Sequence, residues 1–267
     1  MTEAGTIARL HRRAWQARKR ATRVFDERFR RLETGPPDFV GVGAQRSGTS
    51  RWQRLIREHP GVWSPIYASK ERHFFDALAA TAPGDIAPAA YHRLFRRPPG
   101  QIMGEWTTEY MFHPWALPQL AAVAPDARLL VLLRDPVDRY ASGRGFYLHR
   151  GETDLAAIEE KSFARGLYAD QLDRVFAHYA RDRVLVLQYE RCSRDAKGEL
   201  RRTYRFLGLD DSFLPADLDS RVNATRWANA GLQRSEQADL NERYRPQLER
   251  LESLLPEFDF SLWPSTG

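Results

Sequence analysis

Hydrophobic residues follow two different spacings along this chain. Largely apolar runs, which predict strands, occur at residues 38–44, 101–106, 128–133 and 183–189. The first, third and fourth runs show almost no alternation of polar and apolar positions, as is typical of strands buried on both faces of a parallel sheet. Apolar residues spaced by three or four predict helices over residues 50–58, 114–123, 136–148, 168–179, 195–207 and 236–255. The alternation of strand and helix predicts a three-layer α/β/α sandwich around a central parallel sheet.

A separate helical pattern precedes the first strand. Over residues 6–33, apolar residues recur every three or four positions, and most of the remaining surface is arginine. The sequence Thr-Gly-Pro-Pro at residues 34–37 then ends the helix. We therefore expect a basic amphipathic helical arm over residues 1–34 and one domain over residues 35–267. Two interpretations of the arm stay open: its apolar stripe packs on the domain, or its basic face contacts a membrane surface or an acidic partner.

The net charge of +6 is concentrated in this arm. Residues 1–34 hold ten Lys and Arg against four acids, which leaves 31 basic and 31 acidic residues in the rest of the chain. A nucleic-acid-binding domain would carry its positive charge in a patch or groove on the folded body. The distribution therefore argues against a nucleic-acid partner. Only four of the 41 basic residues are lysines: Lys19, Lys70, Lys161 and Lys197.

Cysteine content and hydropathy indicate the compartment. Cys192 is the only cysteine, so neither a disulfide within the chain nor a cysteine-based zinc cluster is expected. The mean hydropathy is −0.58, and no run approaches the roughly 18 apolar residues of a membrane span. The first basic residues are not followed by the apolar stretch of a secretory signal. We expect a cytoplasmic protein.

The first strand runs into a glycine-rich turn that leads directly into a helix, Gly43-Ala44-Gln45-Arg46-Ser47-Gly48-Thr49-Ser50. Backbone N–H groups and the positive end of the helix dipole converge at such a turn, so it predicts a phosphate site. The spacing Gly43-x4-Gly48 matches a Walker A loop, but Thr49 stands where that motif requires lysine, and the cation of the loop is Arg46. A P-loop kinase of small molecules therefore stays only as an alternative.

A second anion-binding pattern follows the third predicted strand. The sequence Arg134-Asp135-Pro136 places an arginine at the carboxyl edge of the sheet, where open α/β folds bind ligands, and it starts a helix that carries Ser142 about two turns later. We expect Arg134 and Ser142 to hold a second phosphate, remote from the first. A nucleotide with two separated phosphates is the natural ligand for this pair of sites.

These blocks resemble the sulfotransferases that use 3′-phosphoadenosine 5′-phosphosulfate (PAPS), most closely the heparan-sulfate-type and bacterial branch. The loop K-x-G-T-[ST/R] of that family, which binds the 5′-phosphosulfate, is similar to residues 46–50. Its R-[DN]-P-x-x-R-x-x-S segment, which binds the 3′-phosphate, is similar to residues 134–142. A third block, K-E-x-H-F-F-D, is present in full at residues 70–76, and a Gly-Leu-Tyr block stands at residues 166–168. The resemblance covers about residues 38–210 and implies a fold with a P-loop-like 5′-phosphosulfate loop.

The resemblance also implies the chemistry. A sulfuryl group would pass from PAPS to a hydroxyl or amine by in-line displacement, with PAP as the product and without a metal ion. Glu71 would take the proton of the acceptor, Arg46 would stabilise the leaving phosphate, and His73 would line the acceptor site or polarise the reacting groups. An ion pair with Lys70 or Arg72 is the alternative for Glu71, and a packed histidine is the alternative for His73. The residues that would bind PAPS are Arg46, Ser47, Gly48, Thr49, Ser50, Arg134 and Ser142.

Two departures from the family pattern bear on this chemistry. Arg46 replaces the loop lysine, and arginine does not readily donate a proton because its pKa stays above about 12. Trp106 replaces the lysine of the E-K-[ST]-P-x-Y block, which weakens the case for an anionic polysaccharide and favours an aromatic or lipid-like acceptor. The acceptor stays open among small molecules, lipids and carbohydrates, and we expect its pocket on loops at residues 77–99 and 143–163. The remaining alternative is an inactive sulfotransferase-like module that docks acidic partners through its arm.

Overall fold

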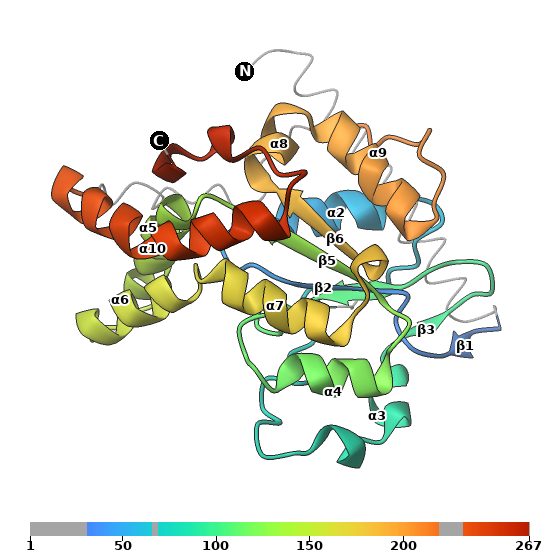
Figure 1. Ribbon diagram of the computed structural model, residues 1–267. Coiled ribbons are helices and arrows are strands. Elements are labelled where there is room, and N and C mark those ends of the chain that lie inside the picture. The colour runs from blue at the N-terminus through green and yellow to red at the C-terminus, as the bar shows by residue number, and fades with distance from the viewer. Residues whose placement is uncertain (1–30, 66–68, 219–231, 267) are drawn as a thin grey trace.

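Four parallel strands form the centre of the protein. A computed structural model of the chain describes residues 31–65, 69–218 and 232–266 (Figure 1). In spatial order the strands are β4 (Gly104–Trp106), β2 (Phe39–Gly43), β5 (Arg128–Leu133) and β6 (Val184–Gln188). All neighbouring pairs are parallel. The predicted central parallel sheet is therefore confirmed, with β4 shorter than expected because Ile102 forms a separate bridge with Val62.

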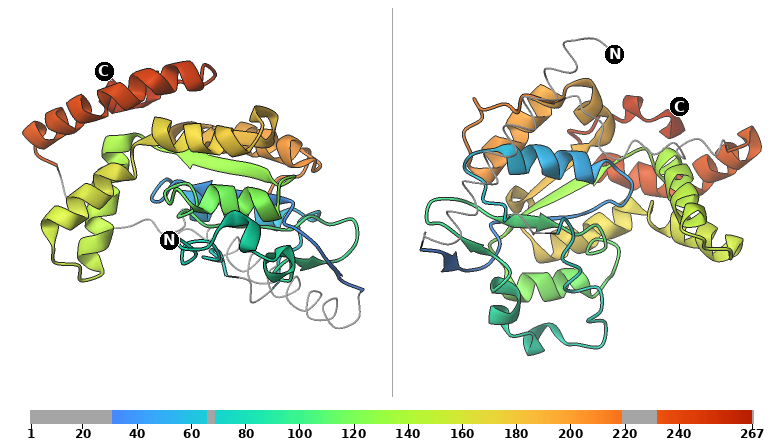
Figure 2. Two further views of the ribbon diagram at one scale, coloured as in Figure 1. Left: turned by 60° about the horizontal axis from the view of Figure 1, so that its bottom comes forward. Right: turned by 180° about the vertical axis from the view of Figure 1, so that it is seen from behind.

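Helices cover both faces of this sheet (Figures 1 and 2). On one face lie α2 (Thr49–Glu58), α8 (Tyr189–Arg194) and α9 (Ala196–Leu207). On the other face lie α4 (Ala116–Val123) and α7 (Tyr168–His178), with α10 (Arg234–Leu254) packed against α7. The protein is thus a mixed α/β fold with the sheet between two helical layers.

Consecutive strand residues are buried in two different cores. In β5, Leu129, Val131 and Leu133 belong to the core beneath α4, α7 and α10, whereas Leu130 and Leu132 belong to the core beneath α2 and α9. The residues of β6 alternate in the same way, and every residue of β2 and β6 is buried. Because both faces of the strands are covered, their sequences show no alternation of polar and apolar positions.

The predicted helices of the domain are present, with ends that differ by one or two residues. The loop expected over residues 143–163 overlaps the predicted helix at its start, where α5 (Pro136–His149) is present. The expectation is wrong for its second part, because α6 (Leu155–Ala164) lies there. Asp154 caps α6 by accepting a hydrogen bond from the Ala157 N–H at 3.1 Å. The stretch 77–99 is also partly helical, with η1 (Pro83–Asp85) and α3 (Pro88–His92). The paired helices α5 and α6 stand off one end of the sheet (Figure 2).

The segment that leads into the domain is extended rather than helical. Strand β1 (Glu33–Thr34) pairs antiparallel with β3 (Arg96–Arg97), so the predicted helix does not reach residue 33. The backbone hydrogen bonds of this pair and the prolines at 36 and 37 both oppose a helical end here. The rest of the predicted arm lies outside the described residues, and its partners and the boundary at residue 34 stay predictions.

The end of the chain folds back onto the carboxyl edge of the sheet. Residues 259–265, which we call the C-terminal strap, carry Trp263, which is almost fully buried. The indole Nε1 of Trp263 donates to Glu190 at 2.8 Å, and the backbone N–H of Ser265 donates to Asp135 at 2.9 Å. The strap therefore contacts the segments that follow β5 and β6.

No helix in the part of the chain described above is long and apolar enough to cross a membrane.

Candidate functional site

The loop after β2 forms the N-terminus of α2. Gly48 precedes the helix with a φ of 85°, and Arg46 has a φ of 69°. Among the described residues no side chain caps this end of α2, so the first backbone N–H groups of the helix are left for an anion. A Cβ atom on Gly48 would lie 2.7 Å from the Tyr189 ring, which shows how closely the loop approaches the end of β6.

The strand order places this loop at the switch point of the sheet. From β2 the chain passes through α2 to β4 on one side, whereas β5 lies on the other side of β2. Because all strands are parallel, the loop after β2 and the Arg134 segment after β5 leave the sheet at the same edge. Open α/β sheets bind their ligands in the crevice at this position.

Arg134 is held at that edge by its neighbours. Its Nη2 donates to Asp138 at 2.9 Å, and its guanidinium lies 5.0 Å from the centre of the Tyr189 ring. The hydroxyl of the buried Tyr168 donates to the backbone oxygen of Arg134 at 3.0 Å. Asp135 does not pair with Arg134, because it caps α5 by accepting from two backbone N–H groups. The Gly-Leu-Tyr block therefore supports the Arg134 segment directly.

Arg46 and Ser142 meet, although the sequence placed them at separate phosphates. Arg46 Nε donates to Ser142 Oγ at 3.1 Å, and its guanidinium lies 5.0 Å from the centre of the Phe146 ring. Burial, and then the nearby charges of Arg134 and Arg139, lower the pKa of Arg46. Like charges gathered at the edge of a sheet are stabilised when an anion binds between them. The two predicted phosphate positions thus share one positive region.

Arg139 lies within the segment at residues 134–142, and no role was assigned to it from the sequence. Its side chain is completely buried, and it donates to the backbone oxygen of Ser162. No carboxylate in the described ranges forms an ion pair with it. The signal in the sequence that marks Arg139 as a residue of this site is its place in the R-D-P-x-x-R pattern. Arg139 adds a buried positive charge behind Ser142.

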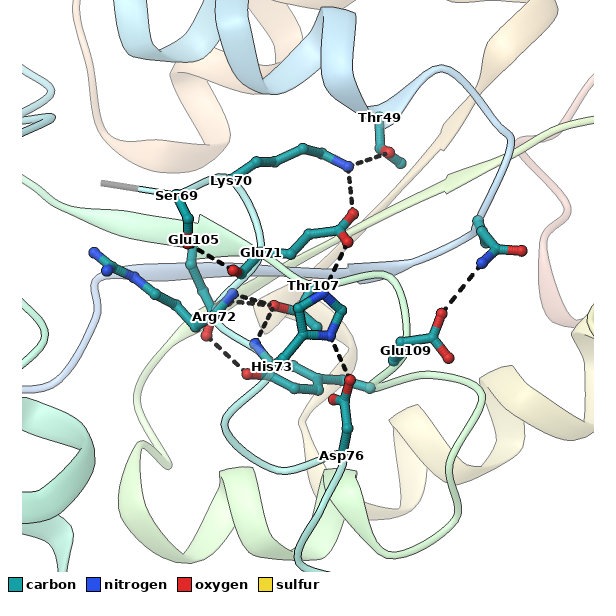
Figure 3. A network of polar contacts seen from close by, with 12 residues as sticks. Thr49, Ser69, Lys70, Glu71, Arg72, His73, Asp76, Glu105, Thr107 and Glu109 are labelled. Atoms are coloured by element: carbon teal, nitrogen blue, oxygen red, sulfur yellow. Dashed lines mark hydrogen bonds and ion pairs between the residues drawn. The ribbon is translucent and has the colours of Figure 1, made fainter. Parts of the chain in front are cut away.

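A chain of polar contacts connects the loop with the block at residues 70–76 (Figure 3). Lys70 Nζ donates to Thr49 Oγ1 at 3.1 Å and to Glu71 Oε1 at 2.6 Å. The other oxygen of Glu71 lies 3.1 Å from His73 Nε2, and His73 Nδ1 lies 2.5 Å from Asp76. The structure therefore brings the predicted base next to the predicted 5′-phosphosulfate loop. The ion pair between Lys70 and Glu71, which was the alternative for Glu71, is also present.

His73 is half exposed, with 50% of its side-chain surface accessible, and it has a φ of 52°. Burial alone would lower its pKa, but the hydrogen bond and charge of Asp76, with the charges of Glu71 and Glu109, outweigh that effect and raise it. The imidazole is therefore a fixed link between two carboxylates and not a packed core histidine. Within the described ranges no group of three His, Cys, Asp or Glu side chains is arranged to hold a metal ion.

A buried carboxylate that the sequence analysis missed lies beneath this segment. Glu105 accepts from the Arg72 N–H at 3.0 Å, and also from Thr107, Tyr91 and Tyr110. Burial raises its pKa, although these hydrogen bonds offset part of the rise. Glu105 thereby fixes the backbone next to Glu71. A charged residue inside a predicted strand was the available signal.

Trp106 does not face an acceptor. Its side chain is completely buried, its indole donates to the Gly43 oxygen at 3.2 Å, and its ring covers Gly41 so closely that a Cβ atom there would overlap the ring. The expectation that Trp106 favours an aromatic or lipid-like acceptor therefore loses its basis, because a core residue cannot contact an acceptor. Tryptophan in place of lysine is visible in the sequence. That its side chain is buried follows only from the pairing of β4 with β2, which places Trp106 opposite Gly41.

A second ion pair that the sequence did not reveal borders the loop. Glu109 accepts from Gln45 at 3.3 Å and from Arg165 at 2.6 Å, and Gln45 in turn accepts from Tyr147 at 2.9 Å. Burial would raise the pKa of Glu109, but the contact with His113 and the charge of Arg165 lower it to about 2. Glu109 therefore stays ionised and connects the loop after β2 with α5 and with the segment between α6 and α7.

Comparison with known proteins identifies the family. The chain matches the sulfotransferase family over residues 66–213, more than half of its length, and it belongs to that family. It is 30% identical over 189 residues to heparan sulfate glucosamine 3-O-sulfotransferase 3B1 of Mus musculus, a match that covers 65% of this chain and 46% of the mouse protein. The match to heparan sulfate glucosamine 3-O-sulfotransferase 6 of Homo sapiens has 29% identity and covers 67% of this chain and 55% of the human protein. The chain thus spans about half of the length of these relatives.

Solved structures agree with this assignment. A sulfotransferase from Alicyclobacillus acidocaldarius superimposes with a TM-score of 0.70 and 28% identity, over 86% of this chain and 99% of that structure. The sulfotransferase domain of the Synechococcus PCC 7002 olefin synthase has the same fold, with a TM-score of 0.52 and 18% identity over 85% of this chain and 97% of that domain. The expected resemblance to sulfotransferases is confirmed in both sequence and fold.

Proposed function

We propose that this protein transfers a sulfuryl group from PAPS to a hydroxyl group of its acceptor and releases PAP. The observation that carries this proposal is the contact of the loop after β2 with both functional blocks: Arg46 donates to Ser142, and Thr49 accepts from Lys70, which also donates to Glu71. The contact between Arg46 and Ser142 fits a nucleotide with a phosphate at each end. The contacts of Lys70 with Thr49 and Glu71 fit an acceptor that lies beside the sulfuryl group of this nucleotide. Membership of the sulfotransferase family supports the same donor.

In this mechanism the protein positions the reactants and stabilises charge. The N–H groups of Gly48, Thr49 and Ser50 bind the 5′-phosphosulfate, while Arg134 and Ser142 bind the 3′-phosphate. The acceptor oxygen attacks sulfur as the bond from sulfur to the 5′-phosphate breaks, and the electron pair of that bond stays on the phosphate. Glu71 takes the acceptor proton, and Arg46 offsets the charge of the departing PAP.

A carbohydrate hydroxyl is the acceptor class that we favour. The names of the two relatives given above specify transfer to glucosamine of heparan sulfate. The buried position of Trp106 removes the earlier argument for an aromatic acceptor. Next to Glu71, the half-exposed imidazole of His73 offers a polar contact of the kind that sugar hydroxyls use.

A thermal-shift titration with PAP tests the donor site. At ~100 times its Kd, a ligand adds about 2.7 kcal/mol to the free energy of unfolding. For a domain of this size the midpoint then rises by roughly 5–10 °C. We expect this shift with PAP and little shift with 5′-AMP, which lacks the 3′-phosphate. A larger shift with ATP and magnesium than with PAP would contradict the proposal and favour a kinase.

The transfer itself is tested by PAP release from PAPS with heparan sulfate as the acceptor. Arg46→Ala removes a group aimed at the leaving phosphate, and loss of one such group lowers kcat by about 10²–10³. Arg46→Lys keeps the charge and should retain more activity than Arg46→Ala. Arg205→Ala, which removes a surface arginine that is 66% exposed, is the matched control and should leave turnover unchanged. Equal activity of Arg46→Ala and the wild type would refute the role of the loop.

A further inference from the structure

Lysine is rare in this chain, and one of its lysines lies at the site. Of 41 basic residues only four are lysines. Lys70 is the one that contacts the loop after β2, and its side chain is 26% exposed. Lys197, in contrast, is exposed on α9. The chain thus has an ammonium group, and not a guanidinium, at this particular place.

The backbone of Lys70 is fixed from two sides. Its oxygen accepts from the Trp106 N–H at 3.3 Å and from the Gln53 side chain at 3.3 Å. Gln53 belongs to α2, and Trp106 ends β4. Lys70 is therefore anchored to the same helix whose N-terminus forms the loop. This anchoring aims its side chain along α2 to Thr49.

The two cations at the loop lie at opposite ends. Arg46 lies against Ser142 and Phe146, on the side of the phosphates that leave with PAP. Lys70 lies between Thr49 and Glu71, on the side of the proposed acceptor base. The sulfuryl group must sit on the base side, because the acceptor attacks sulfur there. Lys70, and not Arg46, is therefore the cation next to the transferred group.

We propose that Lys70 is a further catalytic residue that binds the sulfuryl group of PAPS and stabilises it during transfer. This role rests on the proposed function. An ammonium group has three N–H donors, and in the structure two of them serve Thr49 and Glu71. The third donates to a sulfuryl oxygen. As the bond from sulfur to the phosphate oxygen breaks and the bond to the acceptor oxygen forms, Lys70 holds the sulfuryl oxygens while Glu71 takes the acceptor proton.

The comparison of PAPS with PAP isolates this contact, because PAP has no sulfuryl group. Calorimetric titration gives the Kd of each ligand without an acceptor. A hydrogen bond to a charged group contributes about 1.5–3 kcal/mol, so Lys70→Met should raise the Kd for PAPS by about tenfold or more. The Kd for PAP should stay within about twofold. Methionine keeps an unbranched apolar stem of similar reach, and the exposed Lys197→Met is the matched control.

Turnover gives the second measurement. With PAPS and heparan sulfate, Lys70→Met should lower kcat by about 10²-fold, the effect of removing one donor to a developing charge. Lys70→Arg should restore only part of the lost kcat, because a guanidinium directs its donors within one plane, whereas the compact ammonium points them to three corners.

Three outcomes are decisive. Equal Kd values of wild type and Lys70→Met for PAPS would overturn the role of Lys70 and leave the proposed function intact. Equal weakening of PAPS and PAP would also overturn it, because the residue would then support the loop in general. A wild-type chain that binds neither nucleotide would refute the proposed function itself.

Discussion

At the scale of single residues, Gly48 combines two constraints that no other residue type satisfies. Its φ of 85° lies in the left-handed region, where a side chain costs about 1–2 kcal/mol. A Cβ atom would also lie 2.7 Å from the Tyr189 ring. Tyr189 in turn lies under Arg134. Gly48 therefore determines how closely the two proposed phosphate-binding segments approach each other.

Gly48→Ala should reduce both stability and nucleotide binding. Gly100→Ala is the matched control, because Gly100 has a φ of 78° and no atom within 4 Å of an added Cβ. Both variants carry the backbone strain, but only Gly48→Ala also displaces Tyr189, which adds about 1–3 kcal/mol of overpacking. In urea unfolding, Gly48→Ala should have a lower free energy of unfolding than Gly100→Ala. Only Gly48→Ala should bind PAP more weakly than the wild type. If the two variants lost equal stability and bound PAP equally well, displacement of Tyr189 would affect neither the fold nor the nucleotide site.

Sequence motifs located the residues to which we assign roles in binding and transfer, but they missed residues that support the site through packing and hydrogen bonds. Glu71, Arg46 and Ser142 stand in blocks with a recognisable spacing, and the structure brings them to one loop. Glu105 was missed because its partner Tyr91 comes from a different segment. Trp106 was assigned to the acceptor because a single sequence does not show that its ring covers Gly41.

At the scale of the elements, Glu109 connects parts of the site that come from distant segments. It accepts from Gln45 in the loop after β2 and from Arg165 between α6 and α7. The side chain of Arg165 is only 5% exposed and stacks over the Phe112 ring at 4.1 Å. The pair is therefore a partly buried interaction, and its loss would leave a guanidinium without its carboxylate.

Glu109→Gln should destabilise the protein in a pH-dependent way. The pKa of Glu109 is lowered from 4.5 to about 2, so its ionised form stabilises the folded state above pH 4.5 and loses this effect as the pH falls towards 2. Such a shift corresponds to about 3 kcal/mol at neutral pH. In urea unfolding at pH 7, the free energy of unfolding of the wild type should exceed that of Glu109→Gln by this amount. The difference should shrink as the pH falls below 4.5.

A surface ion pair supplies the control for this variant. Glu257 lies 2.7 Å from Arg181, and both side chains are 43% exposed. Glu257→Gln should change the free energy of unfolding by less than about 1 kcal/mol. A gap between wild type and Glu109→Gln that does not vary with pH would show that the charge of Glu109 is not what stabilises the fold.

Element prediction failed where the buried surface of a helix is small. Only Ile158 and Ser162 of α6 are buried, so its sequence has no apolar stripe and residues 143–163 were expected to be a loop. The strand β1 has two residues and is defined only by its partner β3. By contrast, β5 and β6 are almost entirely buried, and their apolar runs were sufficient to locate them.

At the scale of the whole molecule, the C-terminal strap completes the edge of the sheet that carries the site. Trp263 packs against Phe258 and Phe260 and donates to Glu190. Glu190 also accepts from the Asp135 N–H at 3.1 Å, directly after Arg134. Residues from the last part of the sequence thus fix a segment near its middle. No local pattern predicts such a contact, because it depends on tertiary packing.

Two substitutions at Trp263 should separate packing from hydrogen bonding. Trp263→Ala opens a cavity and should lower the free energy of unfolding by about 3–5 kcal/mol. Trp263→Phe keeps most of the ring volume and loses the donor to Glu190, which should cost about 1 kcal/mol. Because Glu190 and Asp135 support Arg134, Trp263→Ala should also weaken PAP binding at temperatures where it stays folded. Unchanged PAP affinity in a folded Trp263→Ala would show that the strap does not support the nucleotide site.

The packing of Trp106 on Gly41 has an evolutionary consequence. The indole occupies the space where any side chain at position 41 would begin, so the two positions cannot vary independently. Glycine at 41 must have been present before tryptophan was accepted at 106, and a lineage that returns to a smaller residue at 106 is released from the need for glycine. Among sequences that descend from a common ancestor with this protein, tryptophan at 106 should occur only together with glycine at 41.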